Sequence, residues 1–280
     1  MNSHQQQITS SETRLYSSFL NREVTLTIIL PPTFKHSESY QLLLINDGQD
    51  LAAMDMVSIL SDLEAGNQIA PFVTVGIHAN ENRIQEYGTA GQPDYANRGS
   101  LAGATTSFVL HELLPYLNEK YACRQTDIVY AGFSLGGLMA IDMVWNHPHV
   151  FSTTAVFSGA LWWRQKALDA GYRDIDRIMH AIIRNSDYRY GLKFWFQCGG
   201  RDETDDRDGD GIIDSIQDVL ECIGELERKG YQWCKDIAYL EMPDGEHNVP
   251  TWALAMPLFL TWAFGKKERE SQEEVLPAIW

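Results

Sequence analysis

The 280-residue chain predicts one α/β domain with a mostly parallel central sheet and helices on both faces. Several unbroken apolar runs have the length of strands that are buried on both sides, as strands of parallel sheets are. The stretches between these runs place apolar residues three and four positions apart, the spacing of amphipathic helices. Strands and helices therefore alternate along the chain, which favours a parallel sheet over an antiparallel one. A hydrophobic content of 44% is enough for a large buried core.

Seven segments have the pattern of strands, and five have the pattern of helices. The expected strands are residues 23–31, 40–46, 71–79, 126–133, 152–161, 192–199 and 236–243. The expected helices are residues 51–66, 105–121, 135–147, 213–230 and 249–265. Residues 80–104 are rich in glycine, asparagine and polar side chains. Connections of that length in a compact domain tend to be functional or disordered.

The chain ends differ in composition from the middle. Residues 1–12 are polar and are expected to be disordered, so residues 13–265 form the domain. Residues 266–280 form a charged tail that closes with an apolar hexamer. We expect the hexamer to pack either on its own domain or on the second subunit of a homodimer.

The net charge of −16 limits the partners of this protein. Eight acidic residues and one arginine lie within residues 202–218, and the remainder of the chain is still acidic. Such a surface repels nucleic acids and anionic membranes, and it opposes strongly anionic substrates unless basic residues cluster locally. No apolar run is long enough for a membrane span, and no signal peptide is recognisable, so we expect a cytoplasmic protein. The four cysteines are scattered, as is usual for free thiols.

The motif G-x-S-x-G occurs once, as Gly132, Ser134 and Gly136, between an expected strand and an expected helix. A chain that reverses from strand to helix at one residue is strained there, and small neighbours relieve the crowding. Ligands of parallel α/β sheets gather at the carboxyl ends of the strands, where Ser134 lies. The motif thus favours a nucleophilic serine, while the alternative is a glycine-rich turn that binds nothing.

A serine hydroxyl needs a base, and the base needs an acid that orients it. In this kind of fold the acid and then the histidine follow the serine along the chain, each just after a strand. Asp202 and His247 are so placed, whereas His78 follows a strand but precedes the serine. Asp205 and Asp206 are the alternatives for the acid.

The tetrahedral oxyanion of an acyl-transfer reaction needs two N–H donors. The amide of Leu135, directly after the serine, is one candidate. The amide of Gln49 is the other, because the preceding Asp47-Gly48 pair can form a tight turn after a strand. A plain turn is the alternative interpretation of that pair.

Four segments together resemble the enterochelin-esterase-like esterases, a branch of the α/β-hydrolases that includes S-formylglutathione hydrolases, feruloyl and acetylxylan esterases and mycolyltransferases. They are "LLLINDGQDL", "YANRGSLAGATTSFVLHELLPYL", "YAGFSLGGLMAIDMVWNHPHVFSTTAVFSGALWW" and "GEHNVPTWALAMPLFLTW". The resemblance spans about residues 20–265 and implies an α/β-hydrolase fold, a triad of Ser134, Asp202 and His247, the Gln49 and Leu135 amides as oxyanion donors, and no cofactor for the chemistry.

The same resemblance implies residues near the substrate. The segment "NRIQEY" is similar to the family's R-x-x-E segment, which implies that Arg83 and Glu86 shape the entrance. Trp162 and Trp163 resemble the aromatic pair near the nucleophile. Adjacent residues of an extended segment point in opposite directions, so we expect only one of the two to face the pocket. Siderophore esterases of this family often carry an extra N-terminal domain that this chain has no room for, which leaves the substrate open.

The acidic segment 206–217 follows the opening of a calcium loop, D-x-D-x-D-G. Its expected ligands are Asp206, Asp208, Asp210, the carbonyl of Ile212, and Asp214. The last position, where such loops have glutamate, is Gln217, a weaker ligand. The segment is either a structural Ca²⁺ site or a solvated acidic loop that caps the next helix.

The sequence therefore predicts a serine esterase that hydrolyses a small-molecule carboxylic ester through an acyl-enzyme. An acyltransferase that uses the same triad is one alternative. A catalytically silent relative that binds calcium and acts as a binding protein is the other.

Overall fold

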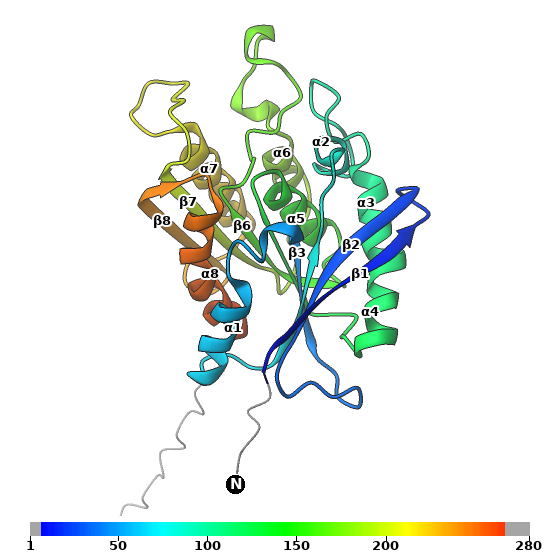
Figure 1. The fold of residues 1–280 in the computed structure, drawn as a ribbon. Coiled ribbons are helices and arrows are strands. Elements are labelled where there is room, and N and C mark those ends of the chain that lie inside the picture. The colour runs from blue at the N-terminus through cyan, green and yellow to red at the C-terminus, as the bar shows by residue number, and fades with distance from the viewer. Residues whose placement is uncertain (1–6, 267–280) are drawn as a thin grey trace, which may run out of the picture.

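One central sheet of eight strands organises the computed structural model, which describes residues 7–266 (Figure 1). The spatial order is β1-β2-β4-β3-β5-β6-β7-β8. The strands are β1 (Thr9–Ser17), β2 (Arg22–Leu30), β3 (Gln41–Asn46), β4 (Phe72–Ile77), β5 (Ile128–Phe133), β6 (Phe151–Phe157), β7 (Lys193–Arg201) and β8 (Ile237–Glu246). All pairs from β4 to β8 are parallel, and β1 and β2 add an antiparallel edge. The predicted mostly parallel sheet is confirmed.

Helices cover both faces of the sheet. They are α1 (Met56–Ala65), α2 (Arg83–Glu86), α3 (Ala102–Phe108), α4 (Leu114–Tyr121), α5 (Leu135–Asn146), α6 (Ile178–Asn185), α7 (Asp214–Lys229) and α8 (Val249–Phe264), and a π-helical turn, Val109–Leu113, joins α3 to α4. Helices α1 and α8 pack on one face with Leu43 and Ile45 of β3. Helices α3 to α7 pack on the other face with Leu42 and Leu44. Alternate side chains of one strand thus enter two separate cores, as the period of a strand requires.

The N-terminal part of the chain differs from its prediction. Residues 9–12 were expected to be disordered, but they begin β1, which pairs with β2 from Thr9 opposite Leu30 to Ser17 opposite Arg22. Most side chains of β1 are exposed because β1 is the edge strand, so its sequence is polar and lacks an apolar run. Helix α6 was also not predicted. The apolar hexamer of the tail, and with it the predicted dimer contact, lies outside the described residues.

The carboxyl ends of the parallel strands lie together at the upper end of the molecule in Figure 1. We call this end the catalytic edge, because the catalytic residues expected from the sequence follow these strands. The segments that follow β3, β5, β7 and β8 there carry Gln49, Ser134, Asp202 and His247. None of the helices within residues 7–266 has the length and apolar character needed to cross a membrane.

Candidate active site

Ser134 occupies the sharp reversal between β5 and α5. Its backbone has φ 53° and ψ −121°, a conformation that costs a non-glycine residue about 1–3 kcal/mol. Hydrogen bonds to the end of β6 and to the segment after it hold Ser134 there: its N–H donates to the carbonyl of Phe157 at 2.9 Å, and its carbonyl accepts from the N–H of Ala160 at 3.0 Å. The side chain is part-exposed. The strained turn therefore presents the hydroxyl at the catalytic edge.

The two glycines of the motif are required by close backbone approaches. A Cβ atom on Gly132 would lie 2.2 Å from the carbonyl oxygen of Gly136, so α5 could not start so close to β5. A Cβ atom on Gly136 would lie 2.8 Å from a carboxylate oxygen of Asp47 and 2.9 Å from the Cβ of Asn46. The predicted reason for the glycines, relief of crowding around the serine, is therefore visible in the structure.

The turn after β3 brings the second expected amide to the same place. Asp47 adopts the left-handed conformation, with φ 61°, and starts a short 3₁₀ helix, Gly48–Asp50. Gln49 lies in the first turn of that helix and Leu135 in the first turn of α5, where N–H groups have no acceptor within the helix. The side-chain oxygen of Gln49 accepts the N–H of Ala79 at 3.0 Å, and this hydrogen bond joins Gln49 to the loop after β4.

Arg83 and Asp47 form an ion pair under this turn. Two hydrogen bonds of 2.7 Å join the guanidinium to both carboxylate oxygens, and Asp47 is buried. The guanidinium also donates to the carbonyl of Phe133 at 3.3 Å and lies 5.2 Å from the ring of Tyr87. Arg83 therefore ties the loop after β4 to the turn after β3 and to the residue before the serine.

Glu86, which was expected beside Arg83 at the entrance, has a different position. Its carboxylate is 3% exposed and accepts the Nε–H of Arg22 on β2 at 2.9 Å. A buried carboxylate already paired with an arginine is not available to a substrate. The ion pair fixes the loop to the antiparallel edge of the sheet, and the expected role of Glu86 at the entrance stays a prediction.

Asp202 and His247 follow β7 and β8 and influence each other electrostatically. Burial raises the pKa of Asp202, while the N–H of Gly199, the hydroxyl of Ser158 and the charge of His247 oppose that rise. Burial lowers the pKa of His247, the charge of Asp202 raises it, and the Arg83 cation lowers it further. The Oδ2 atom of Asp202 accepts the N–H of Gly199 at 3.0 Å.

The histidine has further support from α8. Its ring meets the ring of Trp252 edge-on at 5.4 Å, and the indole N–H of Trp252 donates to the hydroxyl of Ser158 at 2.9 Å. The Oδ1 atom of Asp202 is buried without a hydrogen-bond partner among the described residues. Within residues 7–266 no hydrogen bond joins the side chains of Ser134, His247 and Asp202, and catalytic hydrogen bonds of ligand-free sites are often long.

The two tryptophans after β6 lie in different environments. Trp163 is fully buried, and its ring touches the positions that a Cβ atom on Gly88 or Gly99 would occupy. Trp162 is part-exposed. The two rings thus differ in exposure, and the expectation that only one of them faces the pocket stays a prediction. Both rings lie near the guanidinium of Arg98, at 4.9 Å for Trp162 and 5.5 Å for Trp163. Arg98 was missed because nothing in the 80–104 segment distinguishes it.

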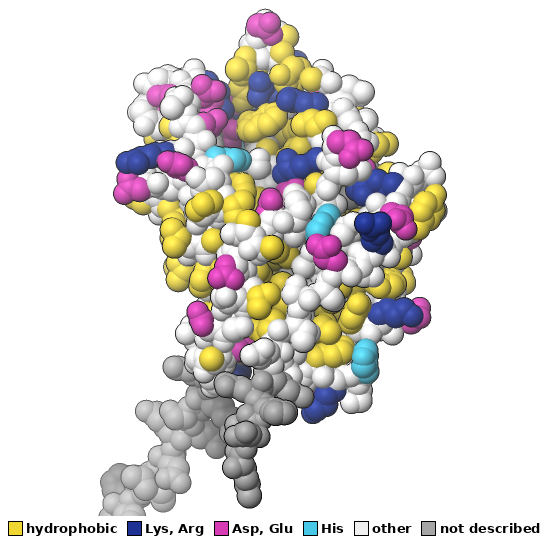
Figure 2. Space-filling view, viewed as in Figure 1, with side chains coloured by type: hydrophobic (Ala, Val, Ile, Leu, Met, Phe, Trp, Pro, Cys, Tyr) yellow, Lys and Arg dark blue, Asp and Glu magenta, His cyan; other side chains and the backbone are white. Residues whose placement is uncertain are grey.

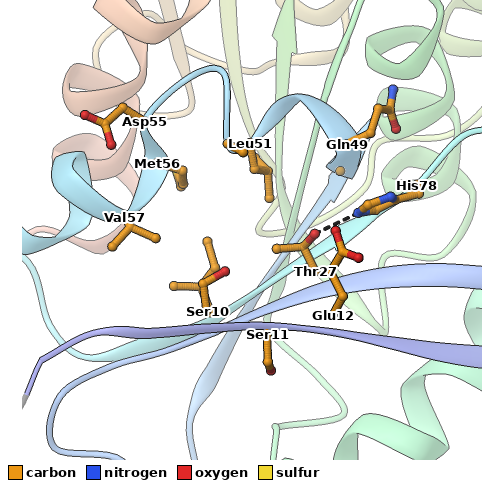
Figure 3. A pocket seen from close by; sticks show the side chains of 13 residues that line it. Ser10, Ser11, Glu12, Thr27, Gln49, Leu51, Asp55, Met56, Val57 and His78 are labelled. Atoms are coloured by element: carbon orange, nitrogen blue, oxygen red, sulfur yellow. Dashed lines mark hydrogen bonds between the residues drawn. The ribbon is translucent and has the colours of Figure 1, made fainter.

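A separate cavity of about 240 Å³ lies behind the turn that carries Gln49 (Figure 3). Residues of β1, β2 and α1 line it, and Ser134, Asp202 and His247 do not. His78 points into it and shares a 2.7 Å hydrogen bond with Thr27, and burial lowers its pKa. His78 therefore lies in a cavity whose lining does not include Ser134.

The acidic segment forms a loop between β7 and α7. Oxygen atoms of Asp206, Asp208 and Asp210 all lie within 4.8 Å of one another. One further expected ligand is engaged elsewhere, because the carboxylate of Asp214 pairs with Arg207 at 3.2 Å. The N–H of Ile212 donates to Asp210 within the loop. The side-chain amide of Gln217, at the last loop position, donates to Asp208 at 2.7 Å. Three carboxylates remain that can share one cation.

Comparison with known proteins agrees with this geometry. The sequence model of the family described as "Putative esterase" matches residues 17–261. The chain belongs to this esterase family. An α/β-hydrolase fold and membership of this family make the protein a carboxylic ester hydrolase. The predicted fold, family and class of enzyme are confirmed.

Relatives of this esterase are distant. A Bacillus subtilis (strain 168) protein, the uncharacterised YjcH, is 24% identical over 87% of this chain and 92% of its own length. The fold of a ferulic acid esterase matches with a TM-score of 0.71, 18% identity and coverage of 92% and 98%. The enterobactin esterase of Shigella flexneri matches with a TM-score of 0.70 and 19% identity, over 91% of this chain and only 59% of that protein. The siderophore hydrolase EstB of Aspergillus nidulans gives a TM-score of 0.67 and 18% identity, with coverage of 91% and 94%.

Proposed function

We propose that this esterase hydrolyses its substrate through a triad of Ser134, His247 and Asp202 and an acyl-enzyme. The Ser134 hydroxyl attacks the ester carbonyl while His247 takes its proton, and His247 then gives that proton to the leaving alcohol. Asp202 holds the imidazole in the tautomer that leaves the atom facing the serine free to accept. The amides of Gln49 and Leu135 bind the oxyanion, and water activated by His247 releases the acid.

The observation that carries this proposal is the strained backbone of Ser134. A strained residue persists only where the surrounding structure forces it, and such residues cluster at functional sites. The hydrogen bonds to Phe157 and Ala160 and the two close glycine contacts supply that force. An ordinary turn would relax to an unstrained conformation.

The electrostatics of the other two residues support their roles. A lowered pKa keeps His247 neutral, and therefore able to accept a proton, at neutral pH. The unpartnered Oδ1 of Asp202 leaves an acceptor for an imidazole N–H. Asp202 also follows β7 more closely than Asp205 or Asp206, both of which lie further along the acidic loop.

Hydrolysis of short-chain p-nitrophenyl esters tests the proposal. Ser134→Ala is expected to lower kcat by about six orders of magnitude, as loss of a triad serine does. Ser107→Ala, a part-exposed serine of α3, is the matched control and should keep wild-type activity. A serine-directed phosphonate should label the wild type once, at Ser134, by peptide mass spectrometry. Turnover by Ser134→Ala close to wild type would rule out the nucleophile.

The same assay separates hydrolysis from acyl transfer. Small alcohols added as acceptors compete with water for the acyl-enzyme, and the ester formed is measured by chromatography. A protein that is inert to both esters and phosphonate would instead be the silent binding protein.

We also propose that Asp206, Asp208 and Asp210 bind one Ca²⁺. The closeness of their oxygen atoms supports this, because carboxylates repel each other unless a cation lies between them. The ion would hold the loop that follows Asp202, so its role is structural. Calcium should raise the melting temperature of the wild type, EGTA should reverse the rise, and Asp208→Asn should reduce it. Equal melting curves with calcium and EGTA would show that the loop is only solvated.

A further inference from the structure

Aromatic rings and arginines form a cluster at the catalytic edge that the proposed mechanism does not use. It comprises Tyr95, Arg98, Trp162, Arg164 and Tyr172, and we call it the arginine–aromatic cluster. The segments that carry it, the loop after α2 and the chain between β6 and α6, rise above the ends of the strands in Figure 1. The N–H of Tyr95 donates to the carbonyl of Arg164 at 3.0 Å, which joins the two segments.

Arg164 is at the centre of the cluster. Its guanidinium carbon lies 5.1 Å from the ring centre of Tyr95, 5.6 Å from that of Tyr172 and 5.9 Å from that of Trp162. Rings at such distances attract a cation and hold a flexible side chain in one place. A guanidinium that is already fixed loses less conformational entropy when it binds a ligand.

The neighbouring arginines are neutralised, but Arg164 is not. Arg98 donates its Nε–H to Asp94 at 2.7 Å, and Arg207, which lies on the ring of Tyr172, pairs with Asp214. Arg164 forms no ion pair with any residue from 7 to 266. Asp174, which accepts the hydroxyl of Tyr172, pairs with Arg207 and Arg177.

The hydrogen-bonding capacity of Arg164 is also largely unused. A guanidinium has five N–H donors, and within residues 7–266 the only hydrogen bond of this one is a 3.3 Å contact from Nη1 to the carbonyl of Trp162. Its Nε atom is buried and has no acceptor among the described residues. A part-buried cation without a counter-ion is costly unless an anion pairs with it.

The cluster lies within reach of the reacting serine. The carbonyl of Ser134 accepts the N–H of Ala160 at 3.0 Å, and Arg164 follows Ala160 by four residues. At no more than about 3.6 Å per residue, the backbone of Arg164 is within roughly 17 Å of Ser134. Trp162 lies between Ala160 and Arg164 in the sequence. A substrate of moderate length could therefore contact the serine at one end and the cluster at the other.

We propose that Arg164 binds a carboxylate of the substrate, so that this esterase prefers esters that carry a free carboxylate away from the bond that is cleaved. A planar guanidinium binds both oxygens of a carboxylate in one geometry, and the rings of Tyr95 and Trp162 contact the apolar part. The inference rests on the proposed function. It bears on the objection from net charge, because several Lys and Arg side chains lie beside hydrophobic ones in the upper middle of Figure 2, with acidic side chains around them.

Matched pairs of esters test the inference. One pair is the mono-p-nitrophenyl ester of adipic acid and the same ester with its second carboxylate capped by a methyl group. The other pair is 4-acetoxybenzoate and its methyl ester, which place the carboxylate on the alcohol part. The measured quantity is the ratio of kcat/KM for the charged member to that for the capped member.

Three variants separate the charge of Arg164 from its shape and from the net charge. Arg164→Gln should lower the ratio of at least one pair by about ten- to a hundredfold, the usual worth of a charged hydrogen bond. Arg164→Lys, which keeps the charge without the planar fork, should recover part of it. Arg14→Gln, a 70% exposed arginine on β1, makes the same change in net charge and should leave both ratios unchanged.

A binding measurement keeps the inference separate from the mechanism. Calorimetry with the Ser134→Ala variant gives dissociation constants for the same esters without turnover. Addition of Arg164→Gln to that variant should weaken the binding of the charged esters and leave the binding of the capped esters unchanged. Unchanged ratios and unchanged dissociation constants in Arg164→Gln would overturn the carboxylate site while leaving the triad intact. If the wild type does not hydrolyse these esters but still binds the charged members more tightly than the capped ones, the triad would be overturned and the carboxylate site would stand.

Discussion

Replacement of Gly132 by alanine tests how tightly β5 and α5 must approach to form the serine turn. The added Cβ would lie 2.2 Å from the carbonyl oxygen of Gly136, 2.3 Å from its carbonyl carbon and 2.8 Å from the nitrogen of Gly137. Ordinary contacts begin near 3.4 Å, so α5 would have to move by about 1 Å. Every residue of α5 from Leu135 to Trp145 is buried, so no free space receives that movement.

The expected cost follows from these distances. Overpacking a core costs about 1–3 kcal/mol, and the obstructing atoms here are backbone atoms that cannot rotate away. We therefore expect Gly132→Ala to lower the free energy of unfolding by about 3 kcal/mol. Movement of α5 also releases the strained turn, so esterase activity should fall even in the folded fraction.

Urea unfolding followed by tryptophan fluorescence measures the change, and p-nitrophenyl acetate hydrolysis at low urea measures activity. Gly224→Ala is the matched control, because that glycine lies inside α7 and the nearest atom to its added Cβ is 3.8 Å away. The control should gain about 0.5–1 kcal/mol, the usual advantage of alanine in a helix. A Gly132→Ala protein as stable and as active as wild type would refute the argument that the close approach creates the turn.

Three other predictions concern charged groups. Asp202→Asn should lower kcat by about four orders of magnitude through the wrong imidazole tautomer, whereas Asp205→Asn should remain near wild type; the reverse result would move the acid along the loop. The acid limb of the kcat/KM profile should lie below the ordinary histidine pKa because burial and Arg83 lower the pKa of His247. Arg83→Gln should shift that limb to higher pH, and an unshifted limb would contradict the assignment. Burial raises the pKa of Asp142 to about 6, and since the folded state then binds the proton more tightly than the unfolded chain, stability should fall by about 3 kcal/mol as pH rises from about 4 to about 6. Chemical unfolding at several pH values should show that slope in wild type and not in Asp142→Asn.

The sheet was predictable because burial on two faces leaves a strong pattern. All six residues of β4, Phe72–Ile77, are buried, and so are those of β5, Ile128–Phe133, which makes both strands continuous apolar runs. The edge strand β1 carries no such run because one edge and much of its surface meet water. The pairing of β1 with β2 is made by backbone hydrogen bonds along the hairpin, and the composition of β1 gives no sign of them.

The site was predictable only where one short segment carries the signal. The motif around Ser134 combines a strand end, two glycines and a helix start within a few residues. The ion pair of Glu86 with Arg22 joins positions 64 residues apart, so the local R-x-x-E pattern gives no sign of it. The arginine–aromatic cluster was invisible for the same reason, since Tyr95 and Arg164 meet only in the folded chain. Calcium binding, the cytoplasmic location and the dimer remain predictions.

The position of the two ends of the described chain has a practical consequence. Gln7 and Ile8 line a hollow with Ala65, and Lys266 donates its N–H to the carbonyl of Gln68, so both ends meet at the end of α1. The catalytic edge lies at the opposite end of the molecule (Figure 1). An anchor or fusion partner attached at either end would therefore leave the serine facing bulk solvent. A short linker between the two ends would also permit circular permutation, with new termini opened in the mostly exposed segment 187–191 before β7, away from the proposed site.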